Sequence, residues 1–420
     1  MLLYSVSIRK NHREVSDGNV SKFKNTKKTT KYLIILSFNS LIVMRLIVNT
    51  SNLYKGGGVQ VGYSFINECV TFSENEYHIF LCKILMEQID KSKFPSNFYF
   101  YDIPKRPSPF FRAWSVVSNL KELEKEIQPD CVFSIFGPSY WSPQAPHLLG
   151  YAIPHFLYPE SPFFKNIGVL SKTKLNLMKM VKKHFLLKNA KYFHVETEDS
   201  RIRLSKFLKC PIDNIYSVSN TYNSIYNRKE NFTDNLLLPA KFENEFRFIT
   251  ISAYYPHKNL DILNEVVVHL KEIGLTNIRF VLTISRDVYE STFSLEAKSQ
   301  IINIGPVSIT KCPQLYSECD VMFLPTLLEC FSANYPEAMK MGIPILTSDL
   351  SFAHEVCKDA ALYFNPLNPT DIVSKIKQIV DDKDLRSQLV SKGTNQLKNF
   401  CTSNERAKQY LKLCEQIIKN

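Results

Sequence analysis

Two glutamates late in the chain, Glu329 and Glu337, have the residue type and spacing of a pair that could bind a polyhydroxylated ligand. Seven residues separate them. A carboxylate accepts hydrogen bonds and can take two hydroxyl groups at once, so each could hold a sugar. The small residues Ser332 and Ala333 lie between the two acids and would let a ligand approach the backbone. The alternative is a pair of ordinary surface glutamates near a helix start, and the spacing alone does not exclude it.

The elements around this pair predict a strand, a loop, a helix and a second strand. Residues 319–324 form an apolar run typical of a strand, residues 338–341 favour a helix that Gly342 ends, and residues 343–347 favour the next strand. The loop that carries Glu329 therefore lies at the carboxyl end of a parallel strand. In open α/β sheets, ligands bind at that edge.

The start of the predicted helix is suited to an anion. Its first N–H groups have no partner within the helix, and its dipole favours negative charge there. We therefore expect the backbone amides around Ser332, Ala333 and Asn334 to bind a diphosphate. Glu329 and Glu337 would then hold the sugars on the two sides of that diphosphate.

The stretch from Leu324 to Asp349 resembles the E-x7-E segment of retaining glycosyltransferases of the GT-B fold, a family that includes many bacterial polysaccharide and lipopolysaccharide sugar transferases. Residues 342–349, GIPILTSD, and residues 355–366, EVCKDAALYFNP, are also similar to that family. The resemblance covers residues 44–420 and is strongest in the second half. It implies an α/β fold of the GT-B class, with two Rossmann-like, doubly wound domains that face a central cleft.

The resemblance also implies roles for particular residues. Glu337 would hold the ribose of a nucleotide-sugar donor and Glu329 the transferred sugar. Lys258 stands where the family uses a lysine to bind the donor diphosphate, and His155 is the candidate for the functional histidine that many members carry in the first domain. A surface lysine and a structural histidine are the alternatives for Lys258 and His155.

Glycines mark two further places where the family binds its donor. Gly305 and Val307 lie where the family's backbone meets the nucleotide base. Gly57 and Gly58 lie in a glycine-rich turn before a helix that we expect from about residue 62 to residue 72. In the family this turn faces the cleft near the donor phosphates, and a simple tight turn is the alternative.

One position departs from the family pattern. The family commonly has an arginine after the first strand of the second domain, whereas this chain has Ala253, Tyr254 and Tyr255. We consider His257 and Arg286 as replacements for the missing charge.

The resemblance divides the chain into four parts. Residues 44–222 form an acceptor-side Rossmann-like domain, and residues 246–400 form a second such domain that binds the nucleotide-sugar. Residues 401–420 form a C-terminal helix that crosses back to the first domain. We expect residues 1–43 to be a disordered appendage or a misassigned start, with a weak membrane anchor as the alternative.

Composition sets the class of protein and of partner. The 420 residues are 45% hydrophobic and 22% charged, which is typical of a globular protein. The net charge of +12 suggests an acidic partner, and no motif indicates nucleic acid. The ten cysteines have no metal-site spacing, which favours a reducing compartment. Residues 163–190 are basic and amphipathic, so they could contact an anionic membrane or be a solvated helix with an apolar core face.

These observations predict a glycosyltransferase that moves a sugar from a nucleotide-sugar to a glycan or lipid-linked acceptor, with retention of anomeric configuration, in the synthesis of a cell-surface polysaccharide. The resemblance implies no cofactor and no bound metal, and a cytoplasmic location that can include the inner face of the membrane. One alternative is a catalytically degenerate GT-B protein that only binds a glycan or scaffolds an assembly. A nucleotide-sugar epimerase of the same fold is the other.

Overall fold

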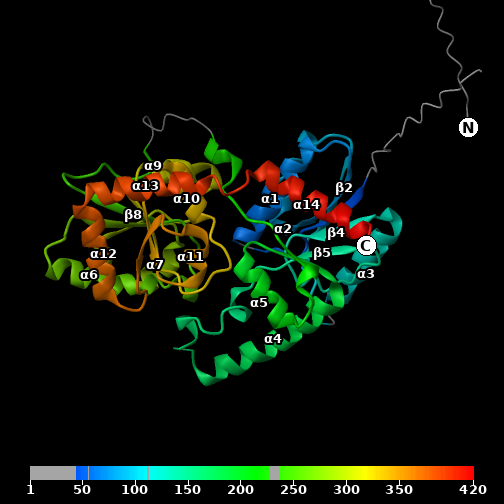
Figure 1. The fold of residues 1–420 in the computed structure, drawn as a ribbon, viewed down its shortest axis with the longest axis horizontal. Helices are drawn as coiled ribbons and strands as arrows, with labels where there is room; N and C mark the ends of the chain where they lie inside the picture. Colours follow the sequence, from blue (N-terminus) through cyan, green and yellow to red (C-terminus); the bar gives the residue numbers. More distant parts are fainter. Residues whose placement is uncertain (1–43, 55, 111–112, 166, 228–235) are drawn as a thin grey trace, which may run out of the picture. The chain divides into compact units, whose positions relative to one another are not determined.

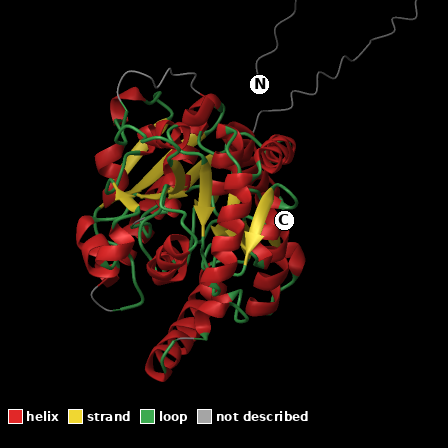
Figure 2. Ribbon diagram, turned by 90° about the vertical axis from the view of Figure 1, so that its left-hand side faces the viewer, coloured by secondary structure: helices red, strands yellow, loops and turns green. Residues whose placement is uncertain are grey.

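The computed structural model describes residues 44–420, except residues 55, 111–112, 166 and 228–235 (Figure 1). The expected N-terminal extension, residues 1–43, lies outside the described residues. The described chain contains two parallel sheets, each with helices on both faces (Figure 2). This arrangement explains the continuous apolar runs of the strands, because a parallel strand between two helix layers is buried on both faces.

The first sheet has seven parallel strands in the order β3-β2-β1-β4-β5-β6-β7. Its strands are β1 (Arg45–Asn49), β2 (Glu76–Cys82), β3 (Phe98–Ile103), β4 (Cys131–Ser134), β5 (His147–Gly150), β6 (Tyr192–Val195) and β7 (Ile215–Ser217). The helices between them are α1 (Gly57–Glu68), α2 (Lys83–Gln88), α3 (Trp114–Ile127), α4 (Val169–Asn189) and α5 (Glu198–Leu208).

The second sheet has six parallel strands in the order β10-β9-β8-β11-β12-β13. Its strands are β8 (Phe246–Thr250), β9 (Ile278–Leu282), β10 (Ile301–Asn303), β11 (Val321–Leu324), β12 (Ile345–Ser348) and β13 (Ala361–Phe364). The helices that follow these strands are α6 (Leu263–Glu272), α7 (Arg286–Thr292), α8 (Leu295–Lys298), α9 (Cys312–Ser317), α10 (Asn334–Met341), α11 (Ser351–Cys357), α12 (Pro369–Asp381) and α13 (Lys383–Leu397).

Both sheets have a topological switch point that prepares a binding site. The strand order reverses between β1 and β4 in the first sheet and between β8 and β11 in the second. Crossover helices leave opposite faces of a sheet at such a point, so a crevice forms outside the carboxyl ends of the two strands. The residues that follow these four strands are therefore the first candidates for contact with a ligand.

The last helix, α14 (Ser403–Ile418), packs on the first sheet although it follows the second in sequence. It contacts α1, β4 and β5 (Figure 1). The ring of Tyr410, which is 1% exposed, lies 5.0 Å from that of Phe133 and 5.7 Å from that of Phe65. This apolar contact brings the polar start of α14 to the carboxyl edge of the first sheet.

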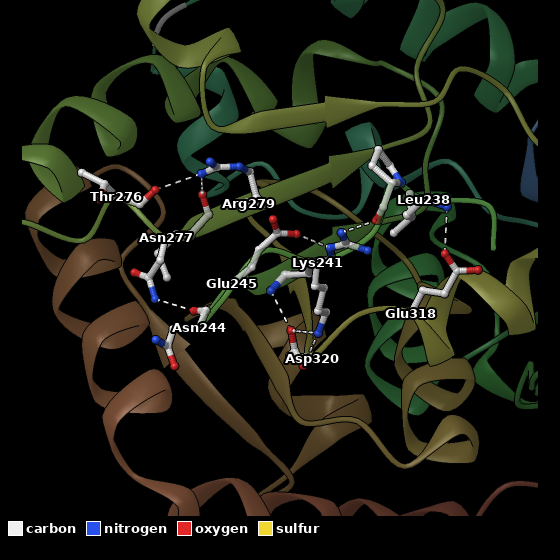
Figure 3. Close-up of polar contacts among 12 residues, drawn as sticks. Leu238, Lys241, Asn244, Glu245, Thr276, Asn277, Arg279, Glu318 and Asp320 are labelled. Carbon is white, nitrogen blue, oxygen red and sulfur yellow. Dashed lines mark hydrogen bonds and ion pairs between the residues drawn. The ribbon is translucent and has the colours of Figure 1, made fainter. Parts of the chain in front are cut away.

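Hydrogen bonds and ion pairs hold the segment that leads into the second sheet (Figure 3). The Asp320 carboxylate accepts a hydrogen bond of 2.7 Å from the Arg247 backbone N–H and pairs with Lys241 Nζ at 2.7 Å. The Glu318 carboxylate accepts the backbone N–H groups of Leu237 and Leu238 at 2.9 and 2.8 Å. Residues 237–247 are thus held against the amino end of β11.

One helix start differs from the predicted one. Helix α1 begins at Gly57 rather than near residue 62, because Gly56 adopts a φ of +70° and turns the chain directly into the helix. Helix α12 is capped by Asn368. Its side chain accepts the N–H groups of Thr370 and Asp371 at 3.1 and 3.2 Å, and Pro369 occupies the first helical position.

Candidate active site

One large cleft is lined by residues that follow β1, β4, β8 and β11, the four strands of the two switch points. Its volume is about 1130 Å³. This slightly exceeds the range of roughly 300–1,000 Å³ that is usual for a pocket holding one small ligand. The cleft is therefore large for a site that binds one small ligand.

Lys258 and Glu329 meet in this cleft. Lys258 ends a short 3-10 helix, Pro256–Lys258, after β8, and its Nζ donates a hydrogen bond to Glu329 Oε1. The two side chains are only 11% and 12% exposed. Thr326 Oγ1 also donates to Glu329 Oε1, at 3.3 Å. A charge in a mostly buried site is destabilising when its partner is absent. Lys258 and Glu329 therefore hold each other in place.

The backbone around this pair is equally well fixed. The Leu327 N–H donates to the carbonyl of His257 at 2.7 Å. The single proton of the Thr326 hydroxyl is shared between this carbonyl, at 3.1 Å, and Glu329 Oε1. The loop after β11 is thereby joined to the segment after β8. A lysine and a carboxylate that are distant in sequence are held in one geometry before any ligand binds.

Ser332, Ala333 and Asn334 line the cleft at the start of α10. Their backbone N–H groups donate no hydrogen bond to any residue that the structure describes. The Asn334 side chain donates to the carbonyl of Ile251 and to Tyr316 Oη, both at 3.0 Å. It thus anchors the helix start, while the amides remain available to an anion at the positive end of the helix.

Glu337 lies in the first turn of α10 and lines the same cleft. Tyr316 Oη donates a hydrogen bond of 3.2 Å to its Oε2. Burial raises the pKa of Glu337 to about 7. Burial has removed most of the water around this carboxylate. Hydroxyl groups of a ligand would replace the lost hydrogen bonds, so the carboxylate favours such a ligand.

Of the two residues predicted to meet the nucleotide base, only one lines the cleft. Val307 lines the cleft, as does Pro306, whereas Gly305 is not among the residues that line it. Gly305 has a φ of +76° and turns the chain after β10. Its contribution is therefore to direct Pro306 and Val307 toward the cleft.

Gly57 and Gly58 line the cleft from the side of the first sheet. They belong to the first turn of α1 and not to a preceding loop. A Cβ on Gly58 would come within 3.3 Å of the Phe136 ring, whereas a Cβ on Gly57 would meet nothing within 4 Å. Space for a ligand therefore adjoins Gly57, and close packing restricts Gly58.

His155 lies near the Lys258–Glu329 pair. Its ring is 5.3 Å from that of His257 and 5.4 Å from that of Phe163. Burial lowers the pKa of both histidines to about 4. His155 is therefore neutral near pH 7 and can orient a substrate by hydrogen bonding without carrying a charge.

The same observation bears on the replacement for the missing arginine. Burial and the adjacent Lys258 charge both lower the pKa of His257 to about 4. His257 therefore carries no positive charge near pH 7 in the ligand-free cleft. Arg286 begins α7 and is not among the residues that line the cleft. The second-sheet side of the described cleft thus relies on Lys258 and on the α10 amides.

Sequence reasoning missed three cations that line the cleft: Arg106, Lys182 and Arg406. They follow β3, lie on α4 and lie on α14, so only the folded chain brings them together. The Arg106 guanidinium lies 4.1 Å from the centre of the Tyr54 ring. Burial and the nearby Arg106 charge lower the pKa of Lys182. Lys182 belongs to the basic, amphipathic stretch of residues 163–190, whereas no local pattern in the sequence marks Arg106 or Arg406.

In the described part of the chain, the histidine, cysteine and acidic side chains form no group of three or more that could hold a metal ion. The prediction that neither a metal nor a cofactor takes part stays a prediction.

Comparisons with known proteins agree with this geometry. Residues 238–396 match the family described as glycosyl transferases group 1. The O-antigen chain mannosyltransferase RfbU of Salmonella typhimurium is 27% identical over 183 residues, which are 42% of this chain and 50% of that protein. The N,N'-diacetylbacillosaminyl-diphospho-undecaprenol alpha-1,3-N-acetylgalactosaminyltransferase of Campylobacter jejuni is 29% identical over 170 residues, which are 39% of this chain and 43% of that protein. The matches thus span half or less of each relative.

Solved structures share the fold over nearly the whole chain. The crystal structure of Anabaena Alr3699/HepE in complex with UDP-glucose has a TM-score of 0.66 and 12% sequence identity, and covers 89% of this chain and 100% of that one. At this identity the likeness concerns the fold alone. The predicted GT-B architecture, two doubly wound sheets with a shared cleft, is confirmed.

Proposed function

We propose that this chain transfers a sugar from a nucleotide-sugar donor to a glycan or lipid-linked acceptor, with retention of anomeric configuration, because its residues 238–396 match the group 1 glycosyl transferases. The relatives named for O-antigen and diphospho-undecaprenol substrates support the synthesis of a cell-surface polysaccharide as its setting. The UDP-glucose complex of the Anabaena protein supports a nucleoside diphosphate as the leaving group.

The observation that carries this proposal is the Lys258–Glu329 pair beside the free amides of α10. In the transfer, the bond from the anomeric carbon to the phosphate oxygen breaks, and a bond to the acceptor oxygen forms. Negative charge then collects on the departing diphosphate. Lys258 and the amides of Ser332 and Ala333 would stabilise that charge from fixed positions, which is the main electrostatic contribution to such catalysis.

The two glutamates and His155 complete the donor site in this proposal. Glu337 would accept hydrogen bonds from the ribose hydroxyls, and Glu329 would accept them from the transferred sugar while it keeps Lys258 in place. His155, which is neutral, would orient the donor from the first-sheet side. A glycan-binding protein without activity has no need of a prearranged lysine–carboxylate pair, so this pair favours a catalyst.

The experiment that tests the proposal is acceptor-dependent release of a nucleoside diphosphate from a nucleotide-sugar. A transferase consumes the donor and releases the diphosphate, whereas an epimerase changes the sugar and releases none.

We also propose that the start of α4 contacts an anionic membrane surface at the inner face of the membrane. Val169 and Leu170 are 79% and 88% exposed, and the exposed lysines Lys165, Lys172 and Lys174 surround them. Apolar side chains among lysines are suited to an interface of anionic lipid. No helix in the described part of the chain is long and apolar enough to cross a bilayer. Further along the same helix, Leu175, Met178 and Lys182 line the cleft, so a lipid-linked acceptor would have a short route to it.

Changing Lys165, Lys172 and Lys174 together to glutamate should weaken binding to vesicles that contain phosphatidylglycerol. The expected loss is on the order of a hundredfold, because each lysine near an anionic surface contributes about 1 kcal/mol. Co-sedimentation with phosphatidylglycerol vesicles and with pure phosphatidylcholine vesicles measures the effect. Equal binding of the wild type to both lipids would contradict the proposal.

A further inference from the structure

A buried polar cluster lines the cleft on the first-sheet side, and the proposed reaction does not use it. Its members are Ser64 of α1, Glu196 directly after β6, Asn220 after β7 and Arg406 of α14. Their exposed fractions are 5%, 6%, 7% and 3%. Burying an ionised carboxyl and a guanidinium is costly, so their retention at a cleft wall needs a reason.

Hydrogen bonds join the four residues into a chain that ends at Glu196. The guanidinium of Arg406 donates to Ser64 Oγ at 2.8 Å and to Asn220 Oδ1. Asn220 Nδ2 in turn donates to Glu196 Oε1 at 2.8 Å. Glu196 Oε2 accepts no hydrogen bond from the residues that the structure describes. Arg406 and Asn220 therefore fix the carboxyl, and one of its oxygens remains without a partner.

Two further oxygens among the residues that line the cleft lack partners as well. Thr221 Oγ1 and Asn52 Oδ1 are buried without a hydrogen bond, and both residues line the cleft with exposed fractions of 4% and 7%. The Asn52 amide cannot simply turn over, because its Nδ2 donates to the backbone carbonyls of Phe136 and Pro138. A buried acceptor without a partner is costly, which indicates that a ligand supplies the missing donors.

The kind of ligand follows from the atoms. Glu196, Asn52 and Thr221 all present oxygens, and two of these three side chains can only accept at the free atom. Such oxygens accept hydrogen bonds from a molecule with several O–H groups. On the second-sheet side, Lys258 and the α10 amides attract phosphate.

We propose that Glu196, Thr221 and Asn52 form a subsite that binds the hydroxyl groups of the acceptor sugar, with Asn220 and Arg406 as positioning residues for Glu196. This inference rests on the proposed function, since it assigns the second substrate of the same reaction.

The state of Glu196 supports this subsite. Burial raises the pKa of its carboxyl to about 7, while Arg406 and the Asn220 hydrogen bond oppose the shift and Glu329 adds to it. Burial thus removes water from the Glu196 carboxyl, and the hydrogen bond from Asn220 replaces only part of that hydration. Hydroxyl groups of a bound sugar would complete the replacement.

Saturation-transfer NMR with the methyl glycosides of mannose, glucose and N-acetylgalactosamine tests the subsite without any need for turnover. The test variants are Glu196→Gln and Thr221→Val, which keep the shape of each side chain. Both should bind the preferred glycoside about tenfold more weakly or worse, as expected for the loss of a hydrogen bond in a buried site. Binding of UDP, GDP or ADP, measured by calorimetry, should stay within about twofold of the wild type; this is our expectation for a donor site on the other wall.

Glu124→Gln is the matched control. Glu124 is 6% exposed, accepts the backbone N–H groups of Gln144 and Ala145, and does not line the cleft. It should leave glycoside binding unchanged. If no glycoside binds the wild type, or if the wild type and both test variants bind alike, the subsite assignment is wrong. If no nucleoside diphosphate binds the wild type, the proposed function fails instead.

Discussion

Replacing Lys258 with alanine should lower kcat for sugar transfer by about a hundredfold or more, as expected for the loss of one preorganised donor to a developing negative charge. The lysine is 9% exposed and is placed by Glu329 and by the 3-10 helix that ends with it. Because the family's usual arginine is absent and His257 is neutral, Lys258 carries a large share of the charge on the diphosphate side. The variant also leaves Glu329 without its cation, close to where the donor sugar would bind.

Lys298→Ala is the control for this experiment. Lys298 pairs with Glu290 at 2.6 Å in the same half of the chain but does not line the cleft. The control should leave kcat within about twofold of the wild type, since an exposed ion pair contributes little. Release of the nucleoside diphosphate under saturating donor measures both variants. A Lys258→Ala enzyme with kcat as high as that of the control would show that Lys258 does not assist the leaving group.

Replacing Glu337 with glutamine should have opposite effects on stability and on binding. Burial raises the pKa of Glu337 to about 7 from its ordinary value of 4.5. Between these values the folded state keeps a proton that the unfolded state has released, so the stability of the protein falls as the pH rises through this window and the full cost is present above pH 7. The cost is about 3 kcal/mol, since each pKa unit corresponds to about 1.4 kcal/mol.

Glutamine removes this cost because it carries no charge. The variant should therefore unfold at a higher temperature than the wild type at pH 8, and the difference should shrink toward pH 4.5. Nucleoside diphosphate binding should weaken by about tenfold to a hundredfold, because the ribose loses hydrogen bonds to a charged acceptor. Thermal unfolding at both pH values and calorimetric titration with UDP, GDP and ADP measure the two effects.

Glu318→Gln provides the contrast. Glu318 is 9% exposed and accepts the N–H groups of Leu237 and Leu238, and it does not line the cleft. This variant should lower stability and leave nucleotide binding unchanged. If Glu337→Gln lowered stability equally at both pH values and kept full affinity, Glu337 would be a structural residue rather than a ligand for ribose.

The parts of the site that the sequence could predict are those with a local signal. The apolar run before Glu329, the small residues after it and the helix that Gly342 ends all act within one stretch of chain, and the structure places this unit as predicted. Lys258 was identified through the resemblance to the family. Its pairing with Glu329 could not be predicted, because it depends on β8 and β11 lying side by side.

The parts that the sequence could not predict arise from burial and from distant contacts. The type of residue shows that His257 could carry a charge, but only the packing around it shows that it does not. Arg406 and Glu196 are separated by more than two hundred residues, and they share a cleft wall only because Tyr410 anchors α14 on the first sheet. Helix α1 was expected from about residue 62, and its start at Gly57 depends on the backbone conformation of Gly56.

The central claim is that a nucleotide-sugar loses its nucleoside diphosphate in this cleft. The most direct test incubates the full chain with UDP-, GDP- and ADP-sugars, in the presence of methyl glycosides or of a glycolipid extract, and follows both products by mass spectrometry. We predict that one class of donor is consumed and yields the free nucleoside diphosphate together with an acceptor that is one sugar heavier. Consumption of no donor, or a change in the sugar with no diphosphate released, would contradict the account.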